Sequence, residues 1–419
     1  MILLNIINIA LGAIFLLCYA YQILDLFITY SKKPTSLPDA SPKRMAVLIA
    51  ARNESRVIHN LLDSLNGQDY PREYFDFFVV ADNCTDNTAD IARSHGALVY
   101  ERFNDTEKGK GYAIDYLIKS IERDYGKRYD AYIIFDADNV AKPNYITEMN
   151  KTFSLGYDVV TSYRNASNYG ESWRAAGQGM YFIRDARVLN LARMRMGTNT
   201  FVSGTGFLFS RALCERYGGW PFHCLTEDGE FTMHNAVHGV KCGYCNSAMF
   251  YDEQATKVRD SWNQQLRWCK GGLQIFRKYL PQLIKGIFSR RFLSCFDMTM
   301  CLTPAYVLSI TAVIVNLFAF VILSIQGNDP IKLLLSMMWM LVVAYLGLFL
   351  FSLAITVSEW KHLRATAPKK ILYMFTFPLF IFTFVPAAFV ALFKKVEWKP
   401  ITHEGSKDKI EEKKQTEGK

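Results

Sequence analysis

Two aspartates, Asp136 and Asp138, stand one residue apart at the end of an apolar run that starts at Tyr132. The run is typical of a short buried strand, in which side chains alternate, so both carboxylates point to the same side. A divalent cation between these like charges and a phosphorylated ligand would relieve their repulsion, because such cations prefer oxygen ligands. The pair therefore indicates a site for Mg²⁺ or Mn²⁺. A plain Asp-rich turn after a strand is the alternative.

Other polar side chains follow the strands that the sequence predicts upstream. Apolar runs predict strands at residues 45–50, 75–81, 97–100 and 132–136, with helical patterns between them at 54–65, 88–94 and 113–123. This alternation predicts an α/β fold with a Rossmann-like, mostly parallel sheet, whose ligands bind at the carboxyl ends of the strands. Glu54, Asp82 and Lys110 lie at those ends. They predict a crevice that binds a base or ribose and a phosphate, and ordinary loop chemistry is the alternative for each.

A predicted strand at residues 199–209 is interrupted by Gly204 and Gly206, with Thr205 between them. A glycine inside a strand usually marks a bulge or a place where a ligand approaches the backbone. The segment is therefore a candidate part of the same site.

Three carboxylates, Glu227, Asp228 and Glu230, stand at the start of a helix predicted to run through His238. Acidic residues in a first turn complement the helix dipole, and this explanation suffices for the motif taken alone.

The last polar motif is Gln264, Arg267 and Trp268, within a helical pattern at residues 261–280. The spacing places the three side chains on one helical face. An arginine can bind a diphosphate through two hydrogen bonds, and an indole can stack on a sugar ring. A helix lying on a membrane surface, with its tryptophan at the interface, explains the motif equally well.

Four apolar segments frame this middle region. Residues 1–29, 296–325, 331–358 and 371–393 are long enough to cross a hydrocarbon core of roughly 30 Å. The first lacks the cleavage pattern of a signal peptide, so we expect an uncleaved membrane helix. Basic residues flank the middle region and place it in the cytoplasm, at the plasma membrane of a bacterium. Because the last segment contains Pro378 and Pro386, we expect a broken or re-entrant helix, with a simple crossing as the alternative.

The chain has 419 residues, of which 50% are hydrophobic, which is too many for one core. The net charge of +9 is modest, and we expect no nucleic-acid partner. An odd number of cysteines, 9, at no framework spacing suits a reducing compartment. The expected regions are a membrane helix (1–30), a cytoplasmic catalytic domain (31–260), interfacial amphipathic helices (261–293), membrane segments (294–393) and a charged tail expected to be disordered (394–419).

Four motifs follow one another along the chain: Asp82, Asp136-Ala137-Asp138, Thr226-Glu227-Asp228 and Gln264-x-x-Arg267-Trp268. In this order they resemble the motifs of the inverting family-2 glycosyltransferases of the GT-A fold. Within that family, the chain resembles the membrane-embedded group of cellulose, hyaluronan, chitin-oligosaccharide and poly-N-acetylglucosamine synthases. The resemblance covers residues 46–268 and the membrane layout. The chain departs from hyaluronan-type enzymes at Trp398-Lys399-Pro400, where they have Trp-Gly-Thr-Arg, and this leaves processivity open.

The resemblance implies a role for each motif. Glu54, Asp82 and Lys110 would hold the nucleotide of a UDP-sugar, and Asp136 and Asp138 its diphosphate, Asp138 most directly through Mg²⁺ or Mn²⁺. Asp228, next to Glu227, would be the general base, and Arg267 would stabilise the leaving group. Trp268 and Gln264 would belong to the acceptor site, lined by Gly204, Thr205 and Gly206.

The resemblance thus implies a transferase that moves a hexose or N-acetylhexosamine onto a growing β-linked polysaccharide. A synthase that adds one sugar to diacylglycerol, ceramide or a polyprenyl phosphate is the alternative, and a partner subunit stays open. Outside the enzymes, His234, His238, Cys242 and Cys245 have spacings seen in zinc sites, so a zinc-stabilised binding module is a second alternative. The apolar segments carry almost no charge, which argues against an ion transporter.

Overall fold

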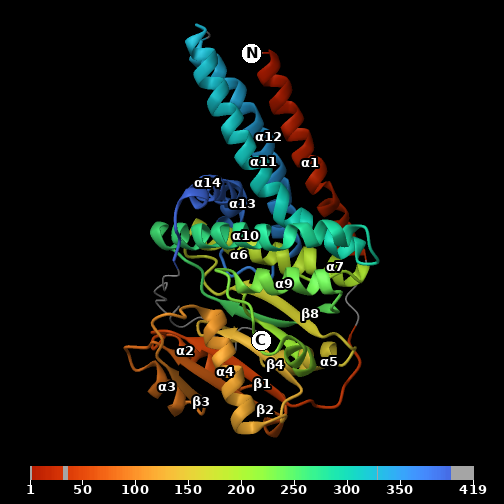
Figure 1. Ribbon diagram of the computed structural model, residues 1–419, viewed down its shortest axis with the longest axis vertical. Helices are drawn as coiled ribbons and strands as arrows, with labels where there is room; N and C mark the ends of the chain where they lie inside the picture. Colours follow the sequence, from red (N-terminus) through yellow and green to blue (C-terminus); the bar gives the residue numbers. More distant parts are fainter. Residues whose placement is uncertain (1, 32–35, 328, 398–419) are drawn as a thin grey trace.

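The computed structural model describes residues 2–31, 36–327 and 329–397. These residues form a globular α/β part on which a group of long helices stands (Figure 1). Lys32, Lys33, the segment Trp398-Lys399-Pro400 and the rest of the tail expected to be disordered lie outside the described residues.

One mixed sheet forms the centre of the globular part. Its described strands follow the order β3-β2-β1-β4-β7-β6-β8-β5. β1 pairs in parallel with β2 and β4, and β2 with β3, whereas β7 runs antiparallel between β4 and β6. The predicted mostly parallel α/β fold is therefore confirmed. The strands are β1 (Met45–Ala51), β2 (Phe75–Asp82), β3 (Leu98–Arg102), β4 (Ala131–Asp136), β5 (Val140–Ala141), β6 (Val159–Ala166), β7 (Phe207–Ser210) and β8 (Cys242–Asp252).

Helices cover both faces of the sheet because the side chains of its buried strands alternate between two apolar cores. Along β1, Met45, Val47 and Ile49 face the core of α2, α3 and α5, whereas Ala46 and Leu48 face the core of α4, α8 and α9. The helices of this part are α2 (Ile58–Asn66), α3 (Thr88–Ser94), α4 (Lys110–Tyr125), α5 (Tyr145–Phe153), α6 (Trp173–Ile183), the π-helical η2 (Arg184–Asn190), α7 (Leu191–Met196), α8 (Arg211–Tyr217), α9 (Glu227–His238) and α10 (Val258–Ile287), with a short 3₁₀ turn η1 (Arg72–Tyr74).

Two predicted elements differ from the structure. The helix expected from Glu54 begins at Ile58, because Asn53 adopts a φ of 58° and the chain turns before entering α2. The strand expected over 199–209 is a loop as far as Gly206, and only Phe207–Ser210 forms β7. Gly204 and Gly206 have φ values of 83° and 62°, which a strand does not allow.

Four helical segments are long and apolar enough to cross a membrane: Leu4–Ser31, Phe292–Ile325, Leu341–Ser358 and Ala367–Phe393, as counted over the described residues. They belong to α1 (Ile2–Ser31), α11 (Phe292–Ile325), α12 (Pro330–Ser358), α13 (Ala367–Phe382) and α14 (Phe384–Phe393). In Figure 1, α1, α11 and α12 rise together away from the sheet, whereas α13 and α14 stay near α10.

The last apolar segment is broken, as the sequence predicted. Pro386 has no N–H to donate to the carbonyl of Phe382, and the helix is interrupted at Thr383 between α13 and α14. The Thr383 hydroxyl instead donates to the side chain of Gln265 on α10, at 2.9 Å. The side of the membrane on which the tail lies stays a prediction.

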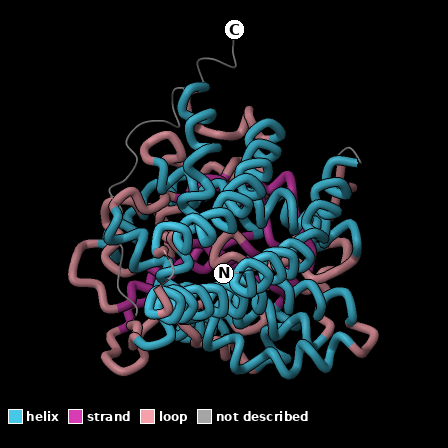
Figure 2. The backbone as a smooth tube through the Cα atoms, turned by 90° about the horizontal axis from the view of Figure 1, so that it is seen from above, coloured by secondary structure: helices cyan, strands magenta, loops and turns pink. Residues whose placement is uncertain are grey.

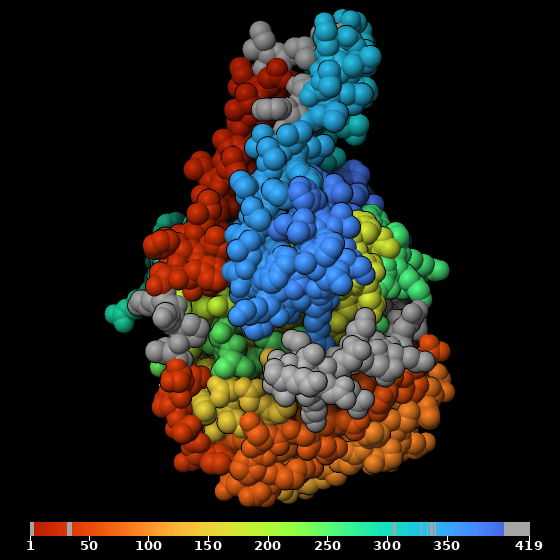
Figure 3. Space-filling view, turned by 180° about the vertical axis from the view of Figure 1, so that it is seen from behind, coloured from red at the N-terminus to blue at the C-terminus, as the bar shows by residue number. Residues whose placement is uncertain are grey.

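Continuous apolar packing joins the apolar helices to the sheet. One core is shared by β6, β8, α6, η2, α12 and α13, and another by α9, α10 and α11. A Cβ on Gly177 of α6 would lie 2.5 Å from the Phe380 ring of α13, so the two helices touch closely there. Seen from above, helices overlie the strands (Figure 2), and from behind the N-terminal and C-terminal helices lie side by side above the sheet (Figure 3).

Candidate active site

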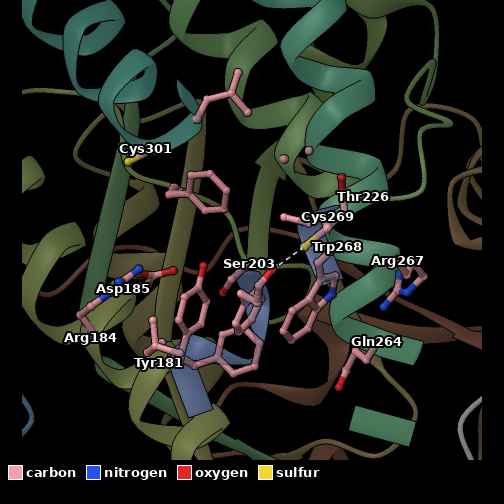
Figure 4. A pocket seen from close by; sticks show the side chains of 18 of the residues that line it. Tyr181, Arg184, Asp185, Ser203, Thr226, Gln264, Arg267, Trp268, Cys269 and Cys301 are labelled. Carbon is pink, nitrogen blue, oxygen red and sulfur yellow. Dashed lines mark hydrogen bonds and ion pairs between the residues drawn. The ribbon is translucent and has the colours of Figure 1, made fainter. Parts of the chain in front are cut away.

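A single cavity of about 1550 Å³ extends from the carboxyl ends of the strands up between the apolar helices. Its lower part is lined by the polar residues that the sequence singled out, and its upper part by apolar residues of α1, α11 and α12. Figure 4 shows its middle, where Tyr181 and Trp268 project into the space between the segment carrying Arg184 and Asp185 and the helix carrying Gln264 and Arg267.

Lys110 joins three elements at the lower end of the cavity. It is the first residue of α4 and follows Gly109, which has a φ of 131°. Its Nζ pairs with the Asp136 carboxylate and donates to the Gly204 carbonyl at 2.7 Å. The positive end of the α4 dipole and this ammonium group therefore lie together at the cavity, which suits a bound phosphate.

The turn that carries Asp138 is fixed from below by buried polar side chains. The Asp136 N–H donates to the Thr205 hydroxyl at 2.9 Å, and Thr205 in turn donates to Asn139, which is fully buried. Asn139 Nδ2 donates to Asp138 Oδ1 at 3.1 Å, and the Glu253 N–H donates to Asp138 Oδ2 at 3.3 Å. These two bonds set the orientation of the Asp138 carboxylate.

Asp82 lies in the cavity wall and is ion-paired. Arg102 Nη1 donates to Asp82 Oδ1 at 2.7 Å, with side-chain exposures of 5% and 7%. A second nitrogen of Arg102 donates to the Glu107 carbonyl at 2.9 Å and so holds the loop before α4. Glu54, which follows the end of β1, also lines the cavity.

Glu227 and Asp228 present two neighbouring carboxylates to the cavity. Burial in the cavity and the charge of Asp228 raise the pKa of Glu227 to about 7, partly offset by Lys110 and Arg267. Burial also raises the pKa of Asp228, against the backbone N–H of Gly229 and the charges of Arg267, Lys110 and Arg164. One of these groups can therefore take up a proton near neutral pH.

The motif on α10 frames the same space. Arg267 donates to the Leu225 carbonyl at 3.1 Å and keeps further N–H donors of the guanidinium. Gln264 accepts a hydrogen bond from Gln178 at 2.9 Å. The Trp268 ring lies nearly parallel to Tyr181 and Phe384, with centroids 6.5 and 6.2 Å away. These rings form an aromatic wall between the polar and apolar parts of the cavity.

Two of the three residues expected to line an acceptor site lie behind the cavity instead. Gly204 lines it, but Thr205 is 1% exposed and bonded within the Asp136 turn. The Gly206 N–H donates to the Ile134 carbonyl, and a Cβ there would lie 2.0 Å from the Phe250 ring. Thr205 and Gly206 thus shape the wall of the cavity from behind.

The zinc hypothesis is wrong. Cys242 and Cys245 belong to the cores on opposite faces of the sheet, because they are three residues apart on β8. His234 and His238 stack on each other with centroids 4.0 Å apart. Across the described parts of the chain, no three His, Cys, Asp or Glu side chains gather as a metal site.

Three residues of the cavity wall were missed by the sequence analysis. Arg164 on β6 donates to Asp252 at 2.7 Å and to the Ser203 carbonyl at 2.5 Å, and its guanidinium lies 3.4 Å from the Phe182 ring centre. Asp252 Oδ1 and both amide atoms of Gln254 are buried and find no hydrogen-bond partner among the described residues. An arginine within an apolar strand and an aspartate at a strand end were the signals available.

Asp136 and Asp138 fit a divalent metal by the chemistry of their donors. Both are half-buried at the cavity, and carboxylate oxygens are ligands that Mg²⁺ and Mn²⁺ prefer. With two protein carboxylates, the remaining ligands would have to come from a bound diphosphate and water.

Comparison with known proteins agrees with this geometry. The family model described as glycosyltransferase like family 2 matches residues 42–271. A beta-monoglucosyldiacylglycerol synthase of Nostoc sp. is 24% identical over 64% of this chain and 57% of its own length. A cellulose synthase catalytic subunit of Komagataeibacter sucrofermentans is 23% identical over 66% of this chain and 38% of its own. The chain thus spans less than two thirds of the length of these curated relatives.

Among solved structures, the mannosyltransferase PcManGT from Pyrobaculum calidifontis, in complex with GDP-Man and Mn²⁺, has a similar fold. The TM-score is 0.61 at 18% identity, over 93% of this chain and 99% of the other.

The buried pair of Asp82 and Arg102 supports a stability prediction. Arg102→Leu leaves the Asp82 charge without its partner, and losing one member of a buried pair costs about 3–5 kcal/mol. We expect a clearly lower midpoint of thermal unfolding in detergent. Arg93→Leu is the matched control, because Arg93 pairs with Asp90 and Glu101 at the exposed surface. Equal midpoints for the two variants would contradict the prediction.

Proposed function

Because this chain belongs to the family described as glycosyltransferase like family 2, we propose that it inverts the anomeric centre of a nucleotide-activated sugar as it transfers the sugar to a lipid hydroxyl at the membrane. The observation that carries the proposal is the cavity itself, which runs from the carboxylates at the strand ends to the apolar helices. The enzyme class follows from the family, and the substrates are inferred from the residues.

The donor lies at the lower end of the cavity in this proposal. Glu54 and Asp82 flank the nucleoside, and Lys110, the α4 N-terminus and Arg267 face the diphosphate. UDP-sugars, carrying a hexose or an N-acetylhexosamine, remain the expected donors. The structurally similar mannosyltransferase was solved with GDP-Man, so the test below also asks which nucleobase the donor carries. The buried, unpaired atoms of Asp252 and Gln254 are suited to bind sugar hydroxyls, since an unmade hydrogen bond in a buried site costs free energy.

Asp136 and Asp138 would hold Mg²⁺ or Mn²⁺, which supplies positive charge to the leaving diphosphate. Asp228 would take the proton of the acceptor hydroxyl. The oxygen then bonds to the anomeric carbon, the bond from that carbon to the diphosphate oxygen breaks, and its electron pair leaves with the diphosphate. Lys110 and Arg267 stabilise the charge that develops there, and base catalysis itself contributes typically 10²–10⁴-fold.

The lining of the upper cavity favours a lipid over a polysaccharide acceptor. A polysaccharide needs hydrogen-bond partners along its length, because a buried polar group without one costs free energy. In the upper cavity the amides of Asn8 and Asn316 bond to each other at 2.9 Å in both directions, and most other lining residues are apolar. Hydrocarbon chains match this lining.

Polysaccharide synthesis is the second candidate. The aromatic wall of Trp268, Tyr181 and Phe384 could stack on a sugar ring of a growing chain. A partner subunit stays open in either case, and a cytoplasmic position of the catalytic part stays a prediction.

The test is turnover of the purified full chain in nanodiscs with Mg²⁺ or Mn²⁺ and a panel of UDP-sugars and GDP-mannose. We expect nucleotide release together with a product that carries one or a few sugars on a lipid. A lipid-free polymer would favour the second candidate, and no release from any donor would overturn transferase activity.

Asp228→Asn tests the assignment of the base. The amide keeps the size of the side chain but cannot accept the proton, so we expect kcat to fall by at least about 10²-fold. Donor binding, measured by calorimetry or by fluorescence of a labelled nucleotide sugar, should change little. Lost donor binding would instead assign Asp228 to the donor site.

Glu227→Gln tests the electrostatics of the pair. The base must be ionised, so kcat/KM rises with pH through the raised pKa values of the two carboxyls. Removing the Glu227 charge lets Asp228 lose its proton at lower pH, and the acid limb of the pH profile should move to lower pH. Glu73→Gln, on the exposed η1 turn at the opposite end of β2, should leave the limb in place. An unmoved limb in Glu227→Gln would show that the two groups do not interact.

A further inference from the structure

We propose that the acceptor is an uncharged lipid alcohol, whose hydrocarbon chains lie in the upper cavity and whose head group meets a cluster of ion pairs that disfavours a phosphorylated lipid. This inference rests on the proposed function and names the class of its acceptor. Both lipid classes have hydrocarbon chains that the upper cavity could hold, so the choice depends on the charges at its lower edge.

The upper cavity is long enough for a lipid chain. Along α1 its lining extends from Asn5 to Ile23. At a rise of 1.5 Å per residue this stretch is about 27 Å long. One leaflet takes up about half of a hydrocarbon core of roughly 30 Å, so an ordinary acyl chain fits within the groove. Leu308 and Val313 of α11 and Leu348 and Phe351 of α12 complete the apolar lining.

Below the upper cavity lies a cluster of charged residues, which we call the collar: Arg184, Asp185, Arg193, Asp297 and Asp25. Arg184, Asp185 and Arg193 line the cavity, and Arg184 and Asp185 can be followed in Figure 4. Asp297 on α11 and Asp25 on α1 lie behind them, with exposures of 8% and 2%.

The collar arginines are already matched by carboxylates. Arg184 donates to Asp185 Oδ1 from two nitrogens, at 2.9 and 2.6 Å. Arg193 donates to both oxygens of Asp297, at 2.6 and 3.2 Å, and also to the Asn190 side chain at 3.1 Å. The Tyr21 hydroxyl donates to Asp297 Oδ1 at 3.1 Å. These bonds neutralise both arginines with carboxylates of the protein.

The net charge of the collar is therefore not positive. Two arginines stand against Asp185, Asp297 and Asp25, and the last of these interacts electrostatically with both Arg193 and Asp297. Arg187, in the same π-helical segment as Arg184, is itself paired with Glu359 at 3.0 Å. A phosphate at this level would lose its hydration without gaining a cation, which is costly in a buried site.

The donor end of the cavity also carries many carboxylates and is proposed to bind a diphosphate, but its arrangement differs. There Asp136 and Asp138 stand one residue apart and can recruit a divalent cation. In the collar each lining arginine holds a carboxylate instead. Hydroxyl groups, by contrast, can donate to Asp185 and accept from Arg184 without any change of charge.

The experiment compares two pairs of acceptors with matched hydrocarbon chains, in which both members keep a free hydroxyl: dioleoylglycerol against dioleoyl phosphatidylglycerol, and dipalmitoylglycerol against dipalmitoyl phosphatidylglycerol. The full chain is held in nanodiscs of zwitterionic lipid with the donor found active, and nucleotide release and glycolipid are measured. We expect kcat/KM for the neutral member of each pair to exceed that of the phosphorylated member by at least about tenfold.

Equal rates, or faster transfer to the phosphorylated lipids, would overturn the inference while leaving the transferase function intact. Transfer to sugars but to no lipid would overturn it too. No nucleotide release with any acceptor would overturn the proposed function itself, so the two failures are distinguishable.

Asp185→Asn tests whether the collar causes the preference for neutral over phosphorylated lipids. Arg184 then loses its partner and becomes available to a phosphate, so the preference for the neutral lipid should fall by on the order of tenfold. Asp90→Asn is the control, because it removes an aspartate from an exposed ion pair with Arg93. An unchanged preference in a folded Asp185→Asn protein would count against the collar, and the wild-type comparison tests the inference where this variant does not fold.

Discussion

The structure depends on gathering like charges in one enclosed place. Parallel strands bring Asp82 and Asp136 to the same edge of the sheet, and α9 adds Glu227 and Asp228. Carboxylates gathered in a half-buried cavity repel each other, and side-chain cations held in fixed positions reduce this repulsion. Arg102 is locked on Asp82, Arg164 on Asp252 and Lys110 on Asp136.

These cations also connect the chain across long stretches of sequence. Lys110 joins the start of α4 to the end of β4 and the loop before β7. Arg164 joins β6, β8 and that same loop. The site is therefore held by the same bonds that neutralise it, and a charge-removing substitution there affects both folding and chemistry. This is why the tests of function use amide variants of the same shape.

Much of the fold was predictable because apolar runs and helical periodicity are local signals. The strands ending at Asp82 and Asp136, helix α9 and the break near Pro386 all follow from neighbouring residues. Asp82, Asp136 and Asp138 were found because strand ends mark them, and Asp228 was found only through the resemblance to a known family; the cavity brings the four together. Their roles remain proposals.

What the sequence could not provide depends on contacts between distant residues. Thr205 and Gly206 were placed on the wrong side of the wall, because only the positions of Asn139 and Phe250 show which way the loop turns. The pairing of Arg102 with Asp82 is likewise visible only in the folded chain. The same holds for the buried amide atoms of Gln254, which have no hydrogen-bond partner among the described residues.

Because the apolar helices stand at one end of the cavity, its lining changes from polar to apolar along its length. The cores shared by α6, α12 and α13 and by α9, α10 and α11 fix the group of long apolar helices directly above the carboxylates. A water-soluble donor can reach the charged end, and an acceptor that dissolves only in lipid can reach the apolar end. Because Trp268, Tyr181 and Phe384 separate the two ends, the reacting hydroxyl and the anomeric carbon would meet where water is displaced by aromatic rings. Excluding water at that point favours transfer to the lipid over hydrolysis of the donor.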